Sequence, residues 1–246
     1  MSRFVPDSVL VADRGVAAVR VVRSLQRLGI KAISVHTTED ASALHATLAD
    51  ESVLIGSTAA SYGDAVKLLE AAQQVSAQAV HPVTANVPLL QEGVLAAGLE
   101  WLGAALQVPV ELSLGDGLVE ARLGEAPVSL PAVAARSAEV VTGLDLTCAA
   151  LTGQATGVAR GGVAVSIDVL ASELAPVSAW GSPELDDVWV DAAVGEGSVP
   201  VDPLLAVLTA WGADRDAAYT LACAAWDQLV IEGPVVHRPE ALGGQP

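Results

Sequence analysis

Three polar side chains could line a small-molecule site: Asp13, His36 and His81. Each ends or directly follows a short apolar run typical of a parallel strand, and α/β sheets bind ligands at the carboxyl ends of their strands. The four histidines show no metal-ligand spacing such as HxxxH or HExxH. Histidines of this kind more often serve structure, so a vestigial pocket at these three residues is the alternative interpretation.

Other motifs that resemble reactive sites have ordinary explanations. Gly161-Gly162 and Gly243-Gly244 lack the following lysine and the strand-to-helix context of a phosphate loop, which predicts a turn and a tail. Glu184, Asp186 and Asp187 are expected in a solvated loop. No pair of acids has a recognisable acid/base context. We therefore predict no catalytic residue, no cofactor and no metal.

A cluster of arginines is the most unusual feature of the chain. Arg20, Arg23 and Arg27 are spaced i, i+3 and i+7, which keeps them within one sector of a helix. Residues 1–31 hold six basic residues and two acidic ones, whereas the rest holds six basic and 27 acidic. An ordinary solvated face remains possible, but arginine is also favoured at interfaces because it pairs bidentately with carboxylates.

Composition limits the classes of partner. The net charge of -17 argues against nucleic acid and against anionic membranes, since both require a basic surface. No apolar run is long enough to span a bilayer, and the N-terminus lacks the pattern of a secretory signal. Cys148 and Cys223 are expected to be reduced and buried. These features predict a soluble, cytoplasmic protein.

The first hundred residues alternate short β-branched runs with helical patterns, as in βαβ units with a parallel sheet. Strands are predicted at Val9–Ala12, Ala32–His36, Ser52–Ile55, Ala79–His81 and Glu100–Leu102. Helices are predicted at Val16–Leu28, Ala41–Ala49, Tyr62–Gln74 and Leu89–Ala97. The first half is therefore predicted to have an α/β, Rossmann-like fold.

The second half has a different pattern. Residues 104–136 contain many glycines and prolines and are expected to form a turn-rich connection. A helix is predicted at Glu139–Leu151, and strands are expected near 163–167, 188–190, 194–199 and 204–210. Asp214 is the predicted N-cap of a closing helix. These elements indicate an α+β unit.

The N-terminal residues resemble the N-terminal domain of biotin carboxylases and related acyl-CoA carboxylase subunits. The family's opening I-A-N-R-G-E-I-A-x-R corresponds to residues 11–20, V-A-D-R-G-V-A-A-V-R. Its A-D-x-x-H-x-x-x-A-D-E element corresponds to residues 41–51, where His45, Ala49, Asp50 and Glu51 are kept. The resemblance continues through SYGDAVKLLEAA and AVHP. These matches are long and colinear.

The other end of the chain resembles the same family. EVVTGLDL at 139–146 is similar to the segment after the family's catalytic strand, and residues 188–242 are similar to its C-terminal domain. The resemblance implies three parts: residues 1–104, a connection 105–136 in place of the ATP-grasp domain, and residues 137–246.

The residues that the family uses for catalysis are absent from this pattern. The family's E-M-N-T-R-x-Q-V-E-H-P-V-T-E aligns with residues 126–139, which places Val128 at the metal-ligand asparagine, Leu130 at the arginine and Ala134 at the later glutamate. Apolar side chains cannot bind Mg²⁺, which requires oxygen ligands. Lys31 and Lys67 are the only lysines, and neither lies in a Gly-rich phosphate loop.

The resemblance also suggests a partner. In the family, the helix that corresponds to 16–28 contributes to the subunit interface, and Arg20 and Arg23 occupy positions that are commonly arginine. Arg27 departs from the pattern, which has an acidic residue there. We therefore expect a non-catalytic protein that forms a homodimer or pairs with a biotin-dependent carboxylase subunit. A recruited ligand-binding protein or enzyme, and a structural relic without a partner, are the alternatives.

Overall fold

The computed structural model describes residues 5–81, 100–101, 107–115, 118–129, 135–148 and 158–243. The chain divides into two compact units. The first takes in Met1–Leu106 and Thr147–Gln154, and the second takes in Gln107–Leu146 and Ala155–Pro246. Each unit is built around its own main sheet.

The first unit has a parallel sheet with the strand order β3-β2-β1-β4-β5. Its strands are β1 (Ser8–Val11), β2 (Lys31–Thr37), β3 (Glu51–Gly56), β4 (Ala79–His81) and β5 (Glu100–Trp101). Its helices are α1 (Gly15–Arg27), α2 (Leu44–Leu48) and α3 (Ala65–Gln74), with a 3₁₀ turn at Ala59–Gly63. The prediction of an α/β unit with a parallel sheet is confirmed.

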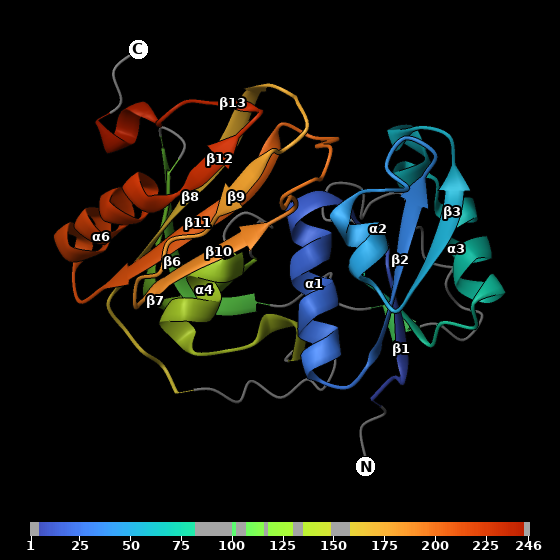
Figure 1. Cartoon of the computed structure of the whole chain (residues 1–246). Helices are drawn as coiled ribbons and strands as arrows, with labels where there is room; N and C mark the ends of the chain where they lie inside the picture. The colour runs from blue at the N-terminus through green and yellow to red at the C-terminus, as the bar shows by residue number, and fades with distance from the viewer. Residues whose placement is uncertain are drawn as a thin grey trace. The chain divides into compact units, whose positions relative to one another are not determined.

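Alternate residues of the central strand face opposite layers. Val9 and Val11 of β1 pack with the apolar face of α1, whereas Leu10 and Ala12 pack with residues of α3 such as Leu68. Figure 1 shows α1 and α3 on opposite sides of this sheet. Because both faces are covered, β1 is a continuous apolar run and its residues 9–11 are completely buried.

Helix α3 begins later than the predicted Tyr62. The carboxylate of Asp64 accepts hydrogen bonds from the backbone N–H groups of Val66 (3.1 Å) and Lys67 (3.3 Å), which is the geometry of an N-cap. Tyr62 lies in the preceding 3₁₀ turn. The cap therefore separates the turn from the helix. The helix predicted at Leu89–Ala97 lies outside the described residues.

The second unit has a sheet with the order β10-β11-β8-β7-β6, and β13 pairs with β8. Its strands are β6 (Gln107–Gly115), β7 (Leu118–Ser129), β8 (Val163–Glu173), β10 (Val188–Ala192), β11 (Leu204–Gly212) and β13 (Val235–Val236). A separate two-stranded sheet joins β9 (Ala179–Gly181) to β12 (Val230–Glu232). The helices are α4 (Ala135–Thr142) and α6 (Arg215–Gln228).

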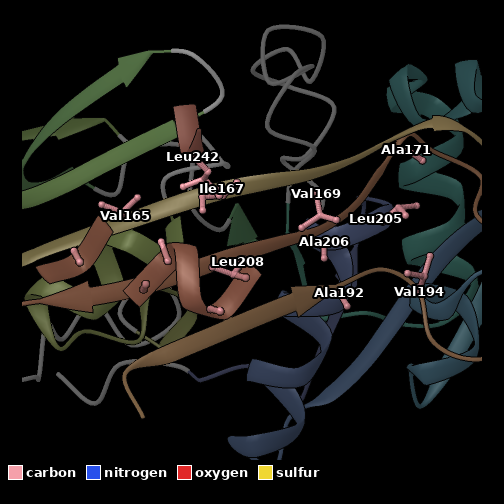
Figure 2. Packing of buried hydrophobic residues seen from close by; sticks show 14 of the residues in the cluster. Val165, Ile167, Val169, Ala171, Ala192, Val194, Leu205, Ala206, Leu208 and Leu242 are labelled. Atoms are coloured by element: carbon pink, nitrogen blue, oxygen red, sulfur yellow. The ribbon is translucent and has the colours of Figure 1, made fainter. Parts of the chain in front are cut away.

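One face of the second sheet forms an apolar core under α6. Figure 2 shows this cluster, with Val165 and Ile167 projecting from β8 and Leu208 from β11. Helix α6 contributes small buried residues to it, Ala218, Ala222 and Ala225. Asp214 caps the helix as predicted, because its side chain accepts a hydrogen bond from Ala217 N at 2.9 Å.

Three expectations for the second half need correction. Residues 107–115 and 118–129 form strands β6 and β7, which pair antiparallel, instead of a turn-rich connection. Pro109 is tolerated because β6 is an edge strand and its register shifts at that residue. The helix expected at Glu139–Leu151 is interrupted by Gly143, whose φ is +69°. Residues 194–199 form a turn instead of a strand.

Candidate functional site

The predicted pocket residues lie at one edge of the parallel sheet. Asp13 follows β1, His36 is the penultimate residue of β2, and His81 ends β4. Strand β1 lies between β2 and β4, and Val11 is paired with both Ser34 and His81. The topology therefore places all three at the carboxyl edge, where α/β sheets usually bind ligands.

Two of these side chains contact nearby backbone. Asp13 is 7% exposed, and its Oδ1 accepts a hydrogen bond from Arg14 N at 2.8 Å. The Nδ1 atom of His36 lies 3.1 Å from the carbonyl oxygen of Thr37. Asp13 and His36 each contact the backbone of the residue that follows them. His81 is partly buried.

A buried polar network lies at the same edge, and it centres on Asp40. Its Oδ1 accepts hydrogen bonds from Thr37 N (2.5 Å) and Thr37 Oγ1 (2.8 Å). Its Oδ2 accepts one from the hydroxyl of Tyr62 at 2.9 Å and lies 3.8 Å from the Arg14 guanidinium. The Nε2 atom of His45 is 3.0 Å from the same hydroxyl. We call these five residues the Asp40 network.

The geometry assigns the protons of the Asp40 network. The Tyr62 hydroxyl has one hydrogen and three neighbours: Asp40 Oδ2, the Val35 carbonyl at 3.2 Å, and His45 Nε2. The carboxylate is the strongest acceptor of the three and takes that hydrogen. Nε2 of His45 then carries a hydrogen and donates it to the hydroxyl oxygen.

Burial and hydrogen bonding act on these groups in opposite directions. Burial raises the pKa of Asp40, but hydrogen bonds from Thr37 and Tyr62 and the nearby His45 outweigh it, so the pKa is below its usual value. Burial and the negative charge of Asp40 raise the pKa of Tyr62 far above its ordinary value. Asp40 is therefore an anion and Tyr62 a neutral donor at neutral pH.

The Asp40 network ties the segment after β2 to the segment after β3. Asp40, His45 and Tyr62 are all at most 4% exposed, and their polar atoms bond to one another. We interpret the network as structural. The sequence prediction missed it because Tyr62 was assigned to a helix; a carboxylate three residues after a strand was the available signal.

A second buried polar cluster lies between α4 and the second sheet. The guanidinium of Arg136 binds both carboxylate oxygens of Asp191, at 2.8 and 2.7 Å, and lies 2.9 Å from Glu139. Burial lowers the pKa of Arg136, but the carboxylates outweigh it and raise the pKa above its ordinary value. Two carboxylates therefore surround this cation, which makes it a poor site for another anion.

Hydroxyl groups continue this polar face of the sheet. Ser137 of α4 is 2.5 Å from Ser166 of β8, which is 2.6 Å from Thr209 of β11. All three are buried. Asp168, two residues along β8, has a pKa raised by burial. The chain of hydroxyls fixes α4 on the sheet face opposite α6.

The predicted arginine cluster on α1 is not uniformly exposed. Arg23 and Arg27 are exposed, whereas Arg20 is half-buried. Arg27 also donates to Ser24 Oγ at 2.9 Å. The exposed part of α1 is thus its last two turns, which continue into Leu28 at 40% exposure.

Within the described ranges, no group of three or more His, Cys, Asp or Glu side chains is arranged to hold a metal ion. In the predicted acidic loop, Asp187 forms an ion pair with Arg160 at 2.5 Å. No helix among the described residues is long and apolar enough to cross a membrane.

Comparison with known proteins identifies related sequences for the first unit. Residues 5–108 match the sequence model of the biotin carboxylase N-terminal domain. The propionyl-CoA carboxylase alpha chain of Caenorhabditis elegans is 37% identical over 126 residues, which cover 49% of this chain and 17% of that protein. The biotin carboxylase of Nostoc sp. is 44% identical over 78 residues, covering 31% and 17%. The chain thus spans less than a fifth of these relatives.

Solved structures extend the likeness in fold to most of the chain. A biotin carboxylase from Campylobacter jejuni has a TM-score of 0.76 at 14% identity, over 94% of this chain and 93% of that one. A pyruvate carboxylase from Rhizobium etli has a TM-score of 0.76 at 18% identity, over 93% of this chain and 36% of that one. Residues 5–108 thus match the biotin carboxylase N-terminal domain family, and the chain has the fold of biotin carboxylase-type carboxylases.

Proposed function

We propose that this chain is a non-catalytic relative of biotin carboxylases. It would act as an assembly or regulatory subunit that pairs with itself or with an acyl-CoA carboxylase subunit. The proposal rests on the resemblance of residues 126–139 to the family's catalytic motif, in which Val128, Leu130 and Ala134 stand where the family has a metal ligand, an arginine and a glutamate. None of these replacements can bind Mg²⁺ or phosphate.

The cations support the same proposal. Lys31 pairs with Glu51 at 2.6 Å, and Lys67 lies 3.9 Å from Asp64. Arg136 is held between two carboxylates. Phosphoryl transfer depends on cations that are directed at phosphate oxygens. These three cations already lie beside carboxylates of their own unit.

A retained frame is the second line of support. The fold likeness spans 94% of this chain and 93% of the Campylobacter jejuni biotin carboxylase chain. Similar solved chains include multi-domain carboxylases. A protein that keeps this fold could retain surfaces for pairing with another subunit even after it has lost the nucleotide site.

Nucleotide binding tests the non-catalytic part of the proposal. The full chain is titrated with MgATP in a calorimeter, beside an active biotin carboxylase as the positive control. We expect no heat of binding above dilution for this chain. Saturable binding with an affinity like that of the control would refute the proposal.

Affinity purification from the native host tests the partner. A tagged chain should recover a carboxylase subunit, and changing Arg20, Arg23 and Arg27 to Glu should abolish this recovery. The matched control is Arg215→Glu, an exposed arginine of the second unit that pairs with Glu120. Loss of recovery with the control as well would assign the effect to general charge instead of the α1 surface.

The alternative, a ligand-binding protein or enzyme that uses Asp13, His36 and His81, has weaker support. Asp13 Oδ1 and His36 Nδ1 lie 2.8 and 3.1 Å from the backbone of the next residue, and Asp13 is only 7% exposed. A metabolite that raises the melting temperature would favour this alternative by mass action.

A further inference from the structure

A short segment that follows β13 contacts α6 in the second unit. It comprises residues 237–243, and its Glu240–Leu242 part is a 3₁₀ helix. Leu242 is 4% exposed and belongs to the same buried cluster as Val165 and Ile167 of β8 (Figure 2). The other residues of the segment are exposed or half-buried. We call residues 237–243 the strap.

Side chains from one side of α6 meet the strap. Tyr219, Cys223 and Asp227 are spaced i, i+4 and i+8, which places them on the same side of the helix. The Tyr219 hydroxyl donates to the carbonyl oxygen of Ala241, and Asp227 forms an ion pair with Arg238. Arg238 also interacts with the Cys223 thiol. These contacts hold the strap on α6.

Few of the contacts of the strap reach beyond the strap itself. The backbone N–H groups of Leu242 and Gly243 donate to the carbonyl oxygens of Pro239 and Glu240, at 2.9 and 2.8 Å, so these hydrogen bonds stay within the strap. The side chain of Asp227 is 63% exposed, and an ion pair as exposed as this one contributes little to stability. Burial of one leucine therefore supplies most of the free energy that seats the strap.

The rest of the second unit is held by a larger core. The cluster that Leu242 joins takes in many further buried residues from β8, β11 and α6. Segments with few buried apolar contacts open at a lower free energy than the core of the same protein. Opening of the strap should therefore occur without unfolding of α6 and the sheet.

We propose that the strap opens from α6 as a unit while α6 and the sheet stay folded, and that this opening uncovers the apolar slot of Leu242. In the closed state the occupant of the slot is this leucine of the same chain. The strap thus controls an apolar surface that is available only in the open state. All of these contacts lie inside the second unit, so the proposal stands or fails independently of MgATP binding and of the proposed function.

Hydrogen exchange of the full chain, followed by NMR at single amides, tests the proposal. The amides of Leu242 and Gly243 are protected only while the strap is seated, because an isolated turn this short is unstable in water. We expect their exchange rates to be nearly independent of urea below the unfolding transition, as in a local opening. Amides at the centre of α6 should exchange faster as urea increases, because they need global unfolding.

Variants of two leucines make the test specific. Leu242→Ala removes the buried side chain and should speed exchange of the Gly243 amide at least about tenfold. The matched control is Leu174→Ala, because Leu174 is a 47% exposed leucine of the same unit outside the strap. This control should leave exchange in the strap unchanged.

A second strap variant covers the case in which Leu242→Ala unfolds the protein. Tyr219→Phe removes the hydrogen bond to Ala241 and should speed exchange of the Gly243 amide about fivefold. Strap amides that follow the urea dependence of α6 would overturn the proposal, because the strap would then unfold only with the core. An effect of Leu174→Ala as large as that of the strap variants would overturn it too.

Discussion

Tyr62 links Asp40 and His45 within the Asp40 network. Its hydroxyl bonds Asp40 and His45, and its ring is 4% exposed. Tyr62→Phe would remove the hydroxyl that lies 3.0 Å from His45 Nε2 and would remove one donor from a buried carboxylate. We expect a loss of about 2 to 3 kcal/mol in the free energy of unfolding, measured by urea denaturation.

The other tyrosine provides a matched control for this change. The hydroxyl of Tyr219 donates only to the carbonyl of Ala241, and the residue is half-buried. Tyr219→Phe should therefore cost about 1 kcal/mol, the net worth of one ordinary hydrogen bond. Equal losses for the two variants would contradict our interpretation of the Asp40 network.

Asp40 should make the stability of the protein depend on acid pH. Because its folded pKa is lowered, the ionised carboxylate contributes stability above its unfolded pKa of about 3.9, and the contribution disappears as pH falls through the lower folded value. The difference in unfolding free energy between wild type and Asp40→Asn should be constant from pH 7 to 5 and shrink below about pH 4. A difference that stays constant under acid conditions would show that ionisation is irrelevant.

At the scale of elements, Gly143 is required where α4 ends. Its φ is +69°, and an added Cβ would lie 2.1 Å from the carbonyl oxygen of Val158. Gly29, after α1, has nearly the same φ of +71° but nothing within 4 Å. Gly29→Ala should cost about 1 kcal/mol from backbone strain alone, whereas Gly143→Ala should cost clearly more in thermal melts. Similar costs would mean that the contact with Val158 relaxes freely.

The cap of α6 is a second element that can be tested in isolation. Asp214→Ala removes the acceptor for Ala217 N and should cost about 1 kcal/mol. Asp216→Ala is the control, because it removes a charge from the first turn of the same helix without removing the cap. Chemical denaturation should show a larger loss in the free energy of unfolding for Asp214→Ala than for Asp216→Ala. A larger loss for Asp216→Ala would mean that the charge near the helix dipole matters more than the cap.

Much of this architecture could be predicted from local patterns. Every predicted strand of the first sheet is present, because each is an apolar run between turns, and the Asp214 cap follows from one residue type before a helix. The pairing of β6 with β7 could not be predicted, since Pro109 and the glycines indicate turns unless the position of the strand at the sheet edge is known. Of the Asp40 network, only the carboxylate close after a strand could be noticed in the sequence, because Arg14, His45 and Tyr62 meet only in the folded chain.

At the scale of the whole molecule, electrostatic repulsion should oppose folding. The chain carries a net charge of -17 and has a sequence pI of about 4.3, so most of its surface charge has one sign at neutral pH. Salt reduces the Debye length from about 30 Å at 0.01 M to about 8 Å at 0.15 M. We therefore expect the melting temperature at pH 7.5 to rise as NaCl increases over this range.

The same measurement at pH 5 separates this effect from local ion pairs. At pH 5 some carboxylates are protonated and the histidines are charged, so the net negative charge is smaller and the rise of the melting temperature with salt should be smaller too. Buried contacts such as Arg136–Asp191 are screened little at either pH and should not reverse the trend. A fall in melting temperature with salt at pH 7.5 would mean that exposed ion pairs such as Lys31–Glu51 stabilise the fold more than the repulsion between like charges destabilises it.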